Sequence, residues 1–237
     1  PHRGVFYVLN KLGMRVMGDI GCYTLGALPP LSAMDACLCM GASIGMAIGF
    51  DKADPEAHKH SVAVIGDSTF AHSGLSALIS TVYNKGAGTV CVLDNRTTAM
   101  TGRQGNPFNG ETLQHRPSRE LDMEGVLTAI GVPDVRTVDP NDMKAVRLAL
   151  REATRSDELS VIVFRSPCVL IDRIRKPAYT IADSCTACGV CTTLGCPAIA
   201  TNDDGHAVID QAMCIGCGQC EQYCAFKSIV STAKEGE

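Results

Sequence analysis

The sequence predicts an α/β protein in which a doubly wound parallel sheet precedes a small α+β domain rich in cysteine. Over residues 16–166, short β-branched runs alternate with segments of helical length. This alternation is typical of strands buried on both faces and joined by crossover helices. Eight of the 13 cysteines fall within residues 185–224. Residues 167–183, with charges and prolines but no sustained period, predict a linker. We therefore expect two domains, residues 1–176 and 177–237.

The large domain is expected to contain five strands and four helices. The predicted strands are residues 16–20, 61–65, 89–93, 134–138 and 159–164, and the predicted helices are residues 35–50, 73–85, 119–130 and 141–155. The first of these helices is weakly polar and interrupted by glycines, which favours a buried helix. Three cysteines, Cys37, Cys39 and Cys91, lie inside these elements and are expected to act as small hydrophobic side chains. Ligands of such sheets bind beyond the carboxyl ends of the strands.

Composition and charge exclude several functional classes. The 237 residues suffice for one sizeable core and a small second domain, and their net charge is −4. Residues 178–237 hold two lysines and seven acids, a local charge of 2 − 7 = −5. This distribution disfavours nucleic acid, and it suits either a basic redox partner or a solvated face. No run approaches the roughly 18 apolar residues of a membrane span. Bunched cysteines and no signal peptide predict a reducing cytoplasm.

The cysteines near the end of the chain form two similar runs. They read Cys185-x2-Cys188-x2-Cys191-x4-Cys196-Pro197 and Cys214-x2-Cys217-x2-Cys220-x3-Cys224. A [4Fe–4S] cubane needs four thiolates, and in two-cluster ferredoxins the fourth thiolate of each run crosses to the other cluster. The prediction is therefore one cluster on Cys185, Cys188, Cys191 and Cys224, and another on Cys214, Cys217, Cys220 and Cys196. A zinc site is the alternative.

Two details depart from the usual ferredoxin runs. Four residues, where three are usual, separate Cys191 from Cys196, and Ala225 stands where a proline normally follows the last cysteine. The longer spacing bears on the geometry and potential of the cluster served by Cys191. The small domain has little apolar sequence, so bound clusters are expected to supply much of its folding energy.

Polar residues follow two predicted strands of the large domain. Gly66-Asp67-Ser68 follows the strand 61–65, and Asn95 with Thr97 follows the strand 89–93. A carboxylate, an amide oxygen and a loop carbonyl suit Mg²⁺, which leaves its other positions to water and phosphate. A helix N-terminus after Thr69 would favour a diphosphate. A simple turn is the alternative, because Gly-Asp after a strand is a common turn sequence.

These segments resemble known thiamin diphosphate enzymes. Gly66-Asp67-Ser68 followed by Asn95 is similar to the thiamin fingerprint, with Ser68 in place of its last glycine. Residues 64–74 and 93–102 resemble the 2-oxoacid:ferredoxin oxidoreductase family, in particular the α subunits of its indolepyruvate branch. The resemblance implies Mg²⁺ bound by Asp67, Asn95 and the Thr97 carbonyl. It also implies cofactor contacts from the residues Gly41, Ser43, Gly66, Ser68 and Met100.

The resemblance extends to the substrate, a third cluster and partners. Relatives that use pyruvate carry Asn where this chain has Met100, a flexible apolar side chain that suits an aryl group or, alternatively, the core. Relatives hold a further cubane beside the thiamin, and Gly21-Cys22 and Ser166-Pro167-Cys168 match two of its turns. Buried free cysteine is the alternative for both. The other thiolates, and the glutamate that activates thiamin, are expected from a preceding segment or separate subunit.

The implied activity is oxidative decarboxylation of an aryl 2-oxoacid, such as indolepyruvate or phenylpyruvate, with coenzyme A as co-substrate and ferredoxin as electron acceptor. A second oxidoreductase subunit and assembly as a dimer of heterodimers are expected. One alternative is an electron-transfer subunit without its own catalysis. Another is an enzyme for a different oxoacid, such as pyruvate or 2-oxoglutarate.

Overall fold

The large domain is built on a parallel six-stranded sheet. The computed structural model describes residues 1–172 and 176–233, so part of the predicted linker and the last four residues of the predicted small domain lie outside it. The strand order is β2-β1-β3-β4-β6-β5. The strands are β1 (Arg15–Gly18), β2 (Ala36–Cys37), β3 (Ser61–Gly66), β4 (Gly88–Asp94), β5 (Asp134–Val138) and β6 (Leu159–Arg165). The five predicted strands are thus confirmed, and β2 is an additional edge strand.

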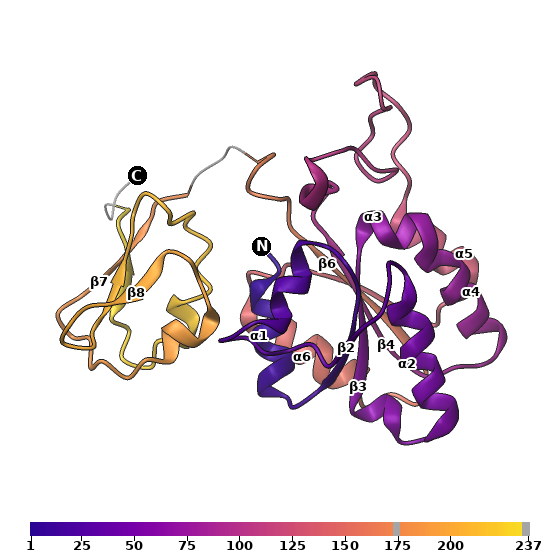
Figure 1. Ribbon diagram of the computed structural model, residues 1–237, viewed down its shortest axis with the longest axis horizontal. Helices are drawn as coiled ribbons and strands as arrows, with labels where there is room; N and C mark the ends of the chain where they lie inside the picture. Colours follow the sequence, from indigo (N-terminus) through magenta and orange to yellow (C-terminus); the bar gives the residue numbers. More distant parts are fainter. Residues whose placement is uncertain (173–175, 234–237) are drawn as a thin grey trace.

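Helices cover both faces of this sheet, as a doubly wound fold requires (Figure 1). They are α1 (Arg3–Lys11), α2 (Ala42–Ala53), α3 (Asp67–Thr69), α4 (Leu75–Tyr83), α5 (Met123–Ile130) and α6 (Met143–Ala153). A π-helical turn, Phe70–Gly74, joins α3 to α4, so helical structure runs unbroken from Asp67 to Tyr83. Short 3₁₀ turns are Cys22–Ala27, Ala57–Lys59, Ala99–Thr101, Val190–Leu194 and Glu221–Tyr223.

Several predicted helix boundaries are wrong for local reasons. The helix predicted from residue 35 begins only at Ala42, because Gly41 caps it with a left-handed φ of 89°. Only Ser43 and Ile44 of α2 are fully buried, so the predicted buried helix is wrong as well. The prediction for Cys37 and Cys39 fails with it, since both are exposed, whereas Cys91 is buried as expected. The helix predicted from residue 119 starts at Met123, because Asp122 caps it by accepting from the Gly125 amide.

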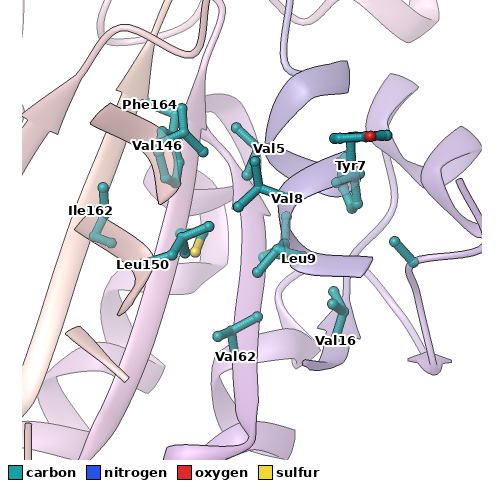
Figure 2. Close-up of a cluster of buried hydrophobic side chains, with 14 of the residues drawn as sticks. Val5, Tyr7, Val8, Leu9, Val16, Val62, Val146, Leu150, Ile162 and Phe164 are labelled. Atoms are coloured by element: carbon teal, nitrogen blue, oxygen red, sulfur yellow. The ribbon is translucent and has the colours of Figure 1, made fainter. Parts of the chain in front are cut away.

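The core lies on both faces of the sheet, and alternate strand residues feed the two faces. Val62 and Val64 of β3 pack toward α1 and α6, whereas Ala63 and Ile65 pack toward α2 and α4. Figure 2 shows the first cluster, where Val5, Val8 and Leu9 of α1 meet the sheet. Burial of each such side chain stabilises the fold by about 1.5–3 kcal/mol. Helix α1, absent from the prediction, therefore forms one wall of this core.

The cysteine-rich part contains two short antiparallel pairs. Its strands are β7 (Tyr179–Ile181), β8 (Ile199–Thr201), β9 (Ala207–Ile209) and β10 (Ile229–Ser231), with β7 paired to β10 and β8 to β9. Strand β7 falls inside the segment 167–183, so the prediction of a linker is wrong at that end. In the part of the chain that the structure describes, no helix is long and apolar enough to cross a membrane.

Candidate functional site

The candidate cofactor site lies at the carboxyl edge of the sheet, where β3 and β4 end side by side. Gly66 at the end of β3 pairs with Leu93 of β4. Asp67 and Ser68 follow the first strand, and Asn95 follows the second. The Thr98 hydroxyl donates to Ser68 Oγ over 2.7 Å and so joins the two loops. The neighbouring position of the two strands, expected from the sequence, is confirmed.

Asp67 is a buried carboxylate with few protein partners. Its side chain is 2% exposed, and Asn106 Nδ2 donates to its Oδ2 over 2.9 Å. The Phe108 amide donates to Asn106 Oδ1, which turns the Asn106 amino group toward Asp67. Burial raises the pKa of Asp67 to about 6, and the nearby Asp94 adds to the rise. A cation would stabilise this carboxylate where the protein alone does not.

The turn after β4 is fixed by an arginine clamp. Arg96 has a left-handed φ of 63°, a strained conformation for a residue with a side chain. Its guanidinium donates to the Phe108 carbonyl over 2.6 Å and lies 3.4 Å from Asp94 Oδ2. Inside the turn, the Thr97 amide donates to Asn95 Oδ1 over 3.1 Å. The side chain of Arg96 therefore holds a backbone shape that the turn needs between two predicted metal ligands.

Gly41 and Ser43 are placed by Asp19, which follows β1 and is fully buried. Asp19 Oδ2 accepts from the Gly41 amide over 2.8 Å and from Ser43 Oγ over 3.2 Å. Gly41 also lies against the helix that starts at Asp67, since a Cβ built on it would sit 2.1 Å from Ser73 Oγ. The α2 N-terminus is thereby brought to the same sheet edge as Asp67.

Tyr23 closes the space between the ends of β1 and β3. A Cβ on Gly66 would sit 2.6 Å from the Tyr23 ring, so the absence of a side chain at Gly66 admits the ring. Met100 behaves differently from the other predicted contacts: its side chain is 55% exposed. The alternative in which Met100 belongs to the core is wrong, because residues 99–101 form an exposed turn beyond the sheet edge.

The eight cysteines of the small part gather as two sets of four. Cys185, Cys188, Cys191 and Cys224 line one small cavity of about 20 Å³. Cys196, Cys214, Cys217 and Cys220 line another of about 240 Å³. Cys224 of the second run lies with the first three cysteines of the first run, and Cys196 of the first run lies with the first three of the second. This is the grouping expected from the sequence. Within the described residues, no three His, Cys, Asp or Glu side chains converge closely enough to hold a single metal ion.

The thiols within a set affect one another's ionisation. Burial, together with the nearby Cys217, Cys196 and Cys214, raises the pKa of Cys220 to about 12. Burial likewise raises the pKa of Cys191, with Cys188, Cys185 and Cys224 contributing. Gathering four such groups is unfavourable unless cations neutralise them. The donor set therefore fits an iron–sulfur cluster.

Both cysteine loops share one backbone pattern. Ala187 and Gly189 flank Cys188 with left-handed φ values of 54° and 72°, and Gly216 and Gly218 flank Cys217 with values of 69° and 75°. Left-handed residues beside right-handed ones form concave nests of N–H groups, a feature of many Fe–S sites. The loop backbones thus fit cluster binding independently of the sulfur atoms.

Cys22 and Cys168 occupy the region between the two parts. Cys22 is exposed and Cys168 is buried. Cys168, Cys217 and Cys22 all lie near the Pro1 nitrogen. The Cys168 amide also donates to the Asn95 carbonyl over 3.0 Å. A predicted cluster ligand is therefore bonded directly to the candidate Mg²⁺ loop.

The present residues fit thiamin diphosphate and Mg²⁺. Asp67, Asn95 and Thr97 would hold the metal, and the buried Asp67 carboxylate, whose pKa stays raised despite its hydrogen bonds, is the observation that favours a cation there. The sequence did not reveal three residues that shape this site: Asp19, Arg96 and Asn106. Asp19 follows a strand and could have been noticed as a strand-end carboxylate, whereas Asn106 lies in a loop without any period.

Comparison with known proteins agrees with this geometry. Residues 19–164 match the family model described as thiamine pyrophosphate enzyme, C-terminal TPP binding domain, and residues 207–226 match the 4Fe-4S binding domain. Indolepyruvate oxidoreductase subunit IorA of Thermococcus kodakarensis is 41% identical over all of this chain, and that of Archaeoglobus fulgidus is 36% identical over 97% of it. The chain spans about 40% of the length of these curated relatives.

Solved structures share the fold. A 2-oxoglutarate:ferredoxin oxidoreductase from Magnetococcus marinus superposes with a TM-score of 0.58 at 17% identity, covering 72% of this chain and 64% of its own. The benzoylformate decarboxylase of Polynucleobacter necessarius gives 0.52 at 16% identity, covering 71% and 34%. With the family model matched across the strand ends that carry Asp67 and Asn95, the chain belongs to the thiamine pyrophosphate enzyme family and is a homologue of indolepyruvate oxidoreductase subunit IorA.

Proposed function

We propose that the protein takes part in the oxidative decarboxylation of aryl 2-oxoacids to acyl-CoA, with electrons leaving through its [4Fe–4S] clusters to ferredoxin. The observation that carries this proposal is the pairing of two sites in one chain. A buried oxygen site for Mg²⁺ lies at the sheet edge, and two sets of four thiols lie in the attached small part. A thiamin enzyme that does not transfer electrons has no use for the second feature.

Each group of residues has a defined task in this proposal. Asp67, Asn95 and the Thr97 carbonyl hold Mg²⁺, and Asn106 keeps the Asp67 carboxylate oriented. Bound thiamin diphosphate supplies the carbanion chemistry and an electron sink. Gly41 and Ser43, set by Asp19, present the α2 N-terminus to the cofactor. The eight cysteines named above would hold clusters that accept electrons singly, and Cys22 and Cys168 would contribute to a third cluster between the two parts.

The remaining parts of the site come from elsewhere in the assembly. The curated relatives are longer than this chain and are named as subunits. We infer that a further segment or subunit supplies the activating glutamate and the missing thiolates, with a second oxidoreductase subunit completing a dimer of heterodimers. A cytoplasmic location agrees with thirteen unpaired cysteines.

The substrate class rests on Met100. Its exposed apolar side chain lies in the turn that follows the Mg²⁺ loop, where it can contact an aryl group of the substrate. Replacing it, as Met100→Asn, should lower kcat/KM for indolepyruvate and phenylpyruvate relative to pyruvate. Because the residue is exposed, the melting temperature should stay unchanged. An equal change of kcat/KM for all oxoacids would show that Met100 does not select the substrate.

The deciding experiment uses the purified assembly. Viologen or ferredoxin reduction is measured with indolepyruvate, phenylpyruvate, pyruvate and 2-oxoglutarate, with and without coenzyme A. Reduction that prefers the aryl oxoacids and requires coenzyme A supports the proposal. Preference for pyruvate or 2-oxoglutarate contradicts the substrate class. Absence of stoichiometric thiamin and magnesium would instead favour an electron-transfer subunit without its own catalysis.

A further inference from the structure

The small part docks on the large domain along α1 and α6. The Tyr7 and Tyr223 rings meet edge to face with centroids 4.6 Å apart. Leu194 is 1% exposed and belongs to the same hydrophobic cluster as α1 and α6, and Arg3 donates to the Gly195 carbonyl. Figure 1 shows the small part beside these two helices. Apolar contacts of this kind hold two surfaces together, but they fix little of the register between them.

A chain of amide hydrogen bonds, which starts at the buried Gln219, crosses the same contact. Gln219 lies between Cys217 and Cys220 and is 6% exposed. Its Nε2 donates to Asn141 Oδ1 over 3.0 Å and to the Pro1 carbonyl over 3.1 Å. Asn141 Nδ2 donates in turn to Ser166 Oγ over 3.2 Å. Ser166 opens the turn that carries Cys168.

The hydrogen-bond partners of Asn141 fix the orientation of its side-chain amide. Asn141 Nδ2 also donates to Asp139 Oδ1 over 3.0 Å, and a carboxylate accepts only. The Asn141 amide is therefore oriented with its oxygen toward Gln219. Beyond Ser166, the Cys168 amide donates to the Asn95 carbonyl, and the Ser166 amide donates to the Asp94 carbonyl. Hydrogen bonds thus lead from the Cys217–Cys220 loop to the candidate Mg²⁺ loop.

We propose that Gln219 and Asn141 are positioning residues that set the distance between the Cys168 turn and the cluster of the Cys217–Cys220 loop, and thereby the rate at which electrons cross between the two parts. This inference rests on the proposed function. Electron tunnelling falls steeply with distance, so a small slip between the parts slows transfer. The Gln219 amide is buried and pairs across this contact, so a slip between the parts would leave a buried polar group unpaired.

The chain also offers a matched control in Gln222. Gln222 Oε1 accepts from the Met143 amide over 2.9 Å, and its Nε2 donates to the Asn141 carbonyl over 2.8 Å. Gln222 therefore supports the contact between the two parts through backbone groups of the large domain. It takes no part in the side-chain hydrogen bonds that join Gln219, Asn141 and Ser166. Substituting Gln222 tests general docking, whereas substituting Gln219 tests the link.

The experiment uses the complete assembly carrying Gln219→Leu, Ser166→Ala, both together, or Gln222→Leu. Iron, sulfide and thiamin contents are measured first. Cluster reduction after mixing with oxoacid is followed by stopped-flow absorbance. Magnetic coupling between clusters is read by electron paramagnetic resonance after reduction with dithionite, a readout independent of turnover.

We expect Gln219→Leu to slow cluster reduction several-fold and to change the coupling signal, with cofactor contents intact and Gln222→Leu close to the parent. Ser166→Ala should act in the same direction and add little to Gln219→Leu, because both interrupt one chain. Additive effects, equal losses from both glutamine variants, or an unchanged coupling signal would overturn the inference. A parent assembly without thiamin or clusters would overturn the proposed function instead.

Discussion

In the large domain the candidate site lies beside a hydrophobic core, whereas in the small part the candidate cluster sites take the place of such a core. In the large domain, the core fills both faces of the sheet, while Asp67 and Asn95 lie at its carboxyl edge. In residues 176–233, the buried hydrophobic side chains are few: Leu194, Ala198, Ala207 and Ile229. Two cavities lined by cysteine lie there, and residues of the large domain help to line the larger one. The large domain can therefore lose its site and keep its fold, whereas the small part cannot.

The largest expected effect is in the small part. Cys217→Ala should remove one cluster and disturb the packing around both, because Cys196 reaches the same cavity from the other run. Iron and acid-labile sulfide should fall, and proteolysis should cut the small part first. Cys91→Ala, inside β4, is the matched control and should leave the iron content unchanged. Zinc without sulfide in anaerobically prepared protein would show that the cluster assignment is wrong.

In the large domain, Asp67→Asn should abolish tight binding of thiamin diphosphate with Mg²⁺ while the fold and the clusters persist. The raised pKa of Asp67 means that its charge destabilises the cofactor-free protein at neutral pH. The cofactor-free variant should therefore be as stable as the parent or more stable. Calorimetric titration and thermal melting measure the two properties. An unchanged cofactor affinity would place the Mg²⁺ site elsewhere.

Core substitutions sharpen the same contrast. Leu150→Ala, at a fully buried position between α6 and the sheet, should lower the free energy of unfolding by about 2–5 kcal/mol. Ile229→Ala in the small part should have a smaller effect while the clusters are bound, because metal–thiolate bonds hold that part together. Chemical denaturation of the loaded protein, followed by a probe for each part, tests this order. Equal losses would mean that the small part depends on an apolar core after all.

Asn106 tests how finely the large-domain site is adjusted. Asn106→Ala leaves Asp67 without its amide donor and should weaken Mg²⁺-dependent cofactor binding about 10–100-fold, as outer-shell substitutions do. Asn109→Ala is the matched control, because Asn109 bonds the Glu111 amide within the same loop. Calorimetry at several Mg²⁺ concentrations distinguishes the two. If both variants bind like the parent, Asp67 is positioned without the loop.

The smallest effect concerns acid stability of the large domain. Although burial opposes it, hydrogen bonds from Arg165 and Thr137 lower the pKa of Glu124 to about 2. A carboxyl group with a lowered folded pKa stabilises the fold above its unfolded pKa of about 4.3, and that contribution is lost as pH falls toward 2. Glu124→Gln should therefore flatten the decline of stability between these values. A decline parallel to the parent's would show that the ion pair contributes nothing to folding.

The sequence predicted the strands well because β3, β4 and β6 are short, β-branched and buried on both faces. Prediction failed where one residue overrides a pattern. Gly41 adopts a left-handed conformation and α2 begins only after it, while Cys37 lies in the edge strand β2 and is exposed, as is Cys39. Helix α1 was missed because residues 5–9 form one short apolar run, and periodicity alone does not tell such a run in a helix from a buried strand.

In the site, too, residues at strand ends were predicted from the sequence, whereas a residue from a distant loop was not. Asp67 and Asn95 follow strands, and topology brings strand ends together, so the sequence was sufficient to associate them. Asn106 reaches Asp67 from a loop 39 residues away, and a contact of that kind leaves no local pattern. The cysteine sets were predictable for another reason: their spacing reflects the geometry of the ligand rather than that of the protein.

The matching left-handed residues on either side of Cys188 and Cys217 give the two cysteine loops the same local backbone conformation. Each loop takes its shape from the same two backbone positions, and three of those four positions are glycine. Ala187 is the one position where the halves differ in this respect, so the first loop bears a strain that its counterpart avoids. Ala187→Gly would relieve this strain, whereas Gly216→Ala would introduce it in the second loop and place a Cβ 2.5 Å from the Pro177 carbonyl oxygen.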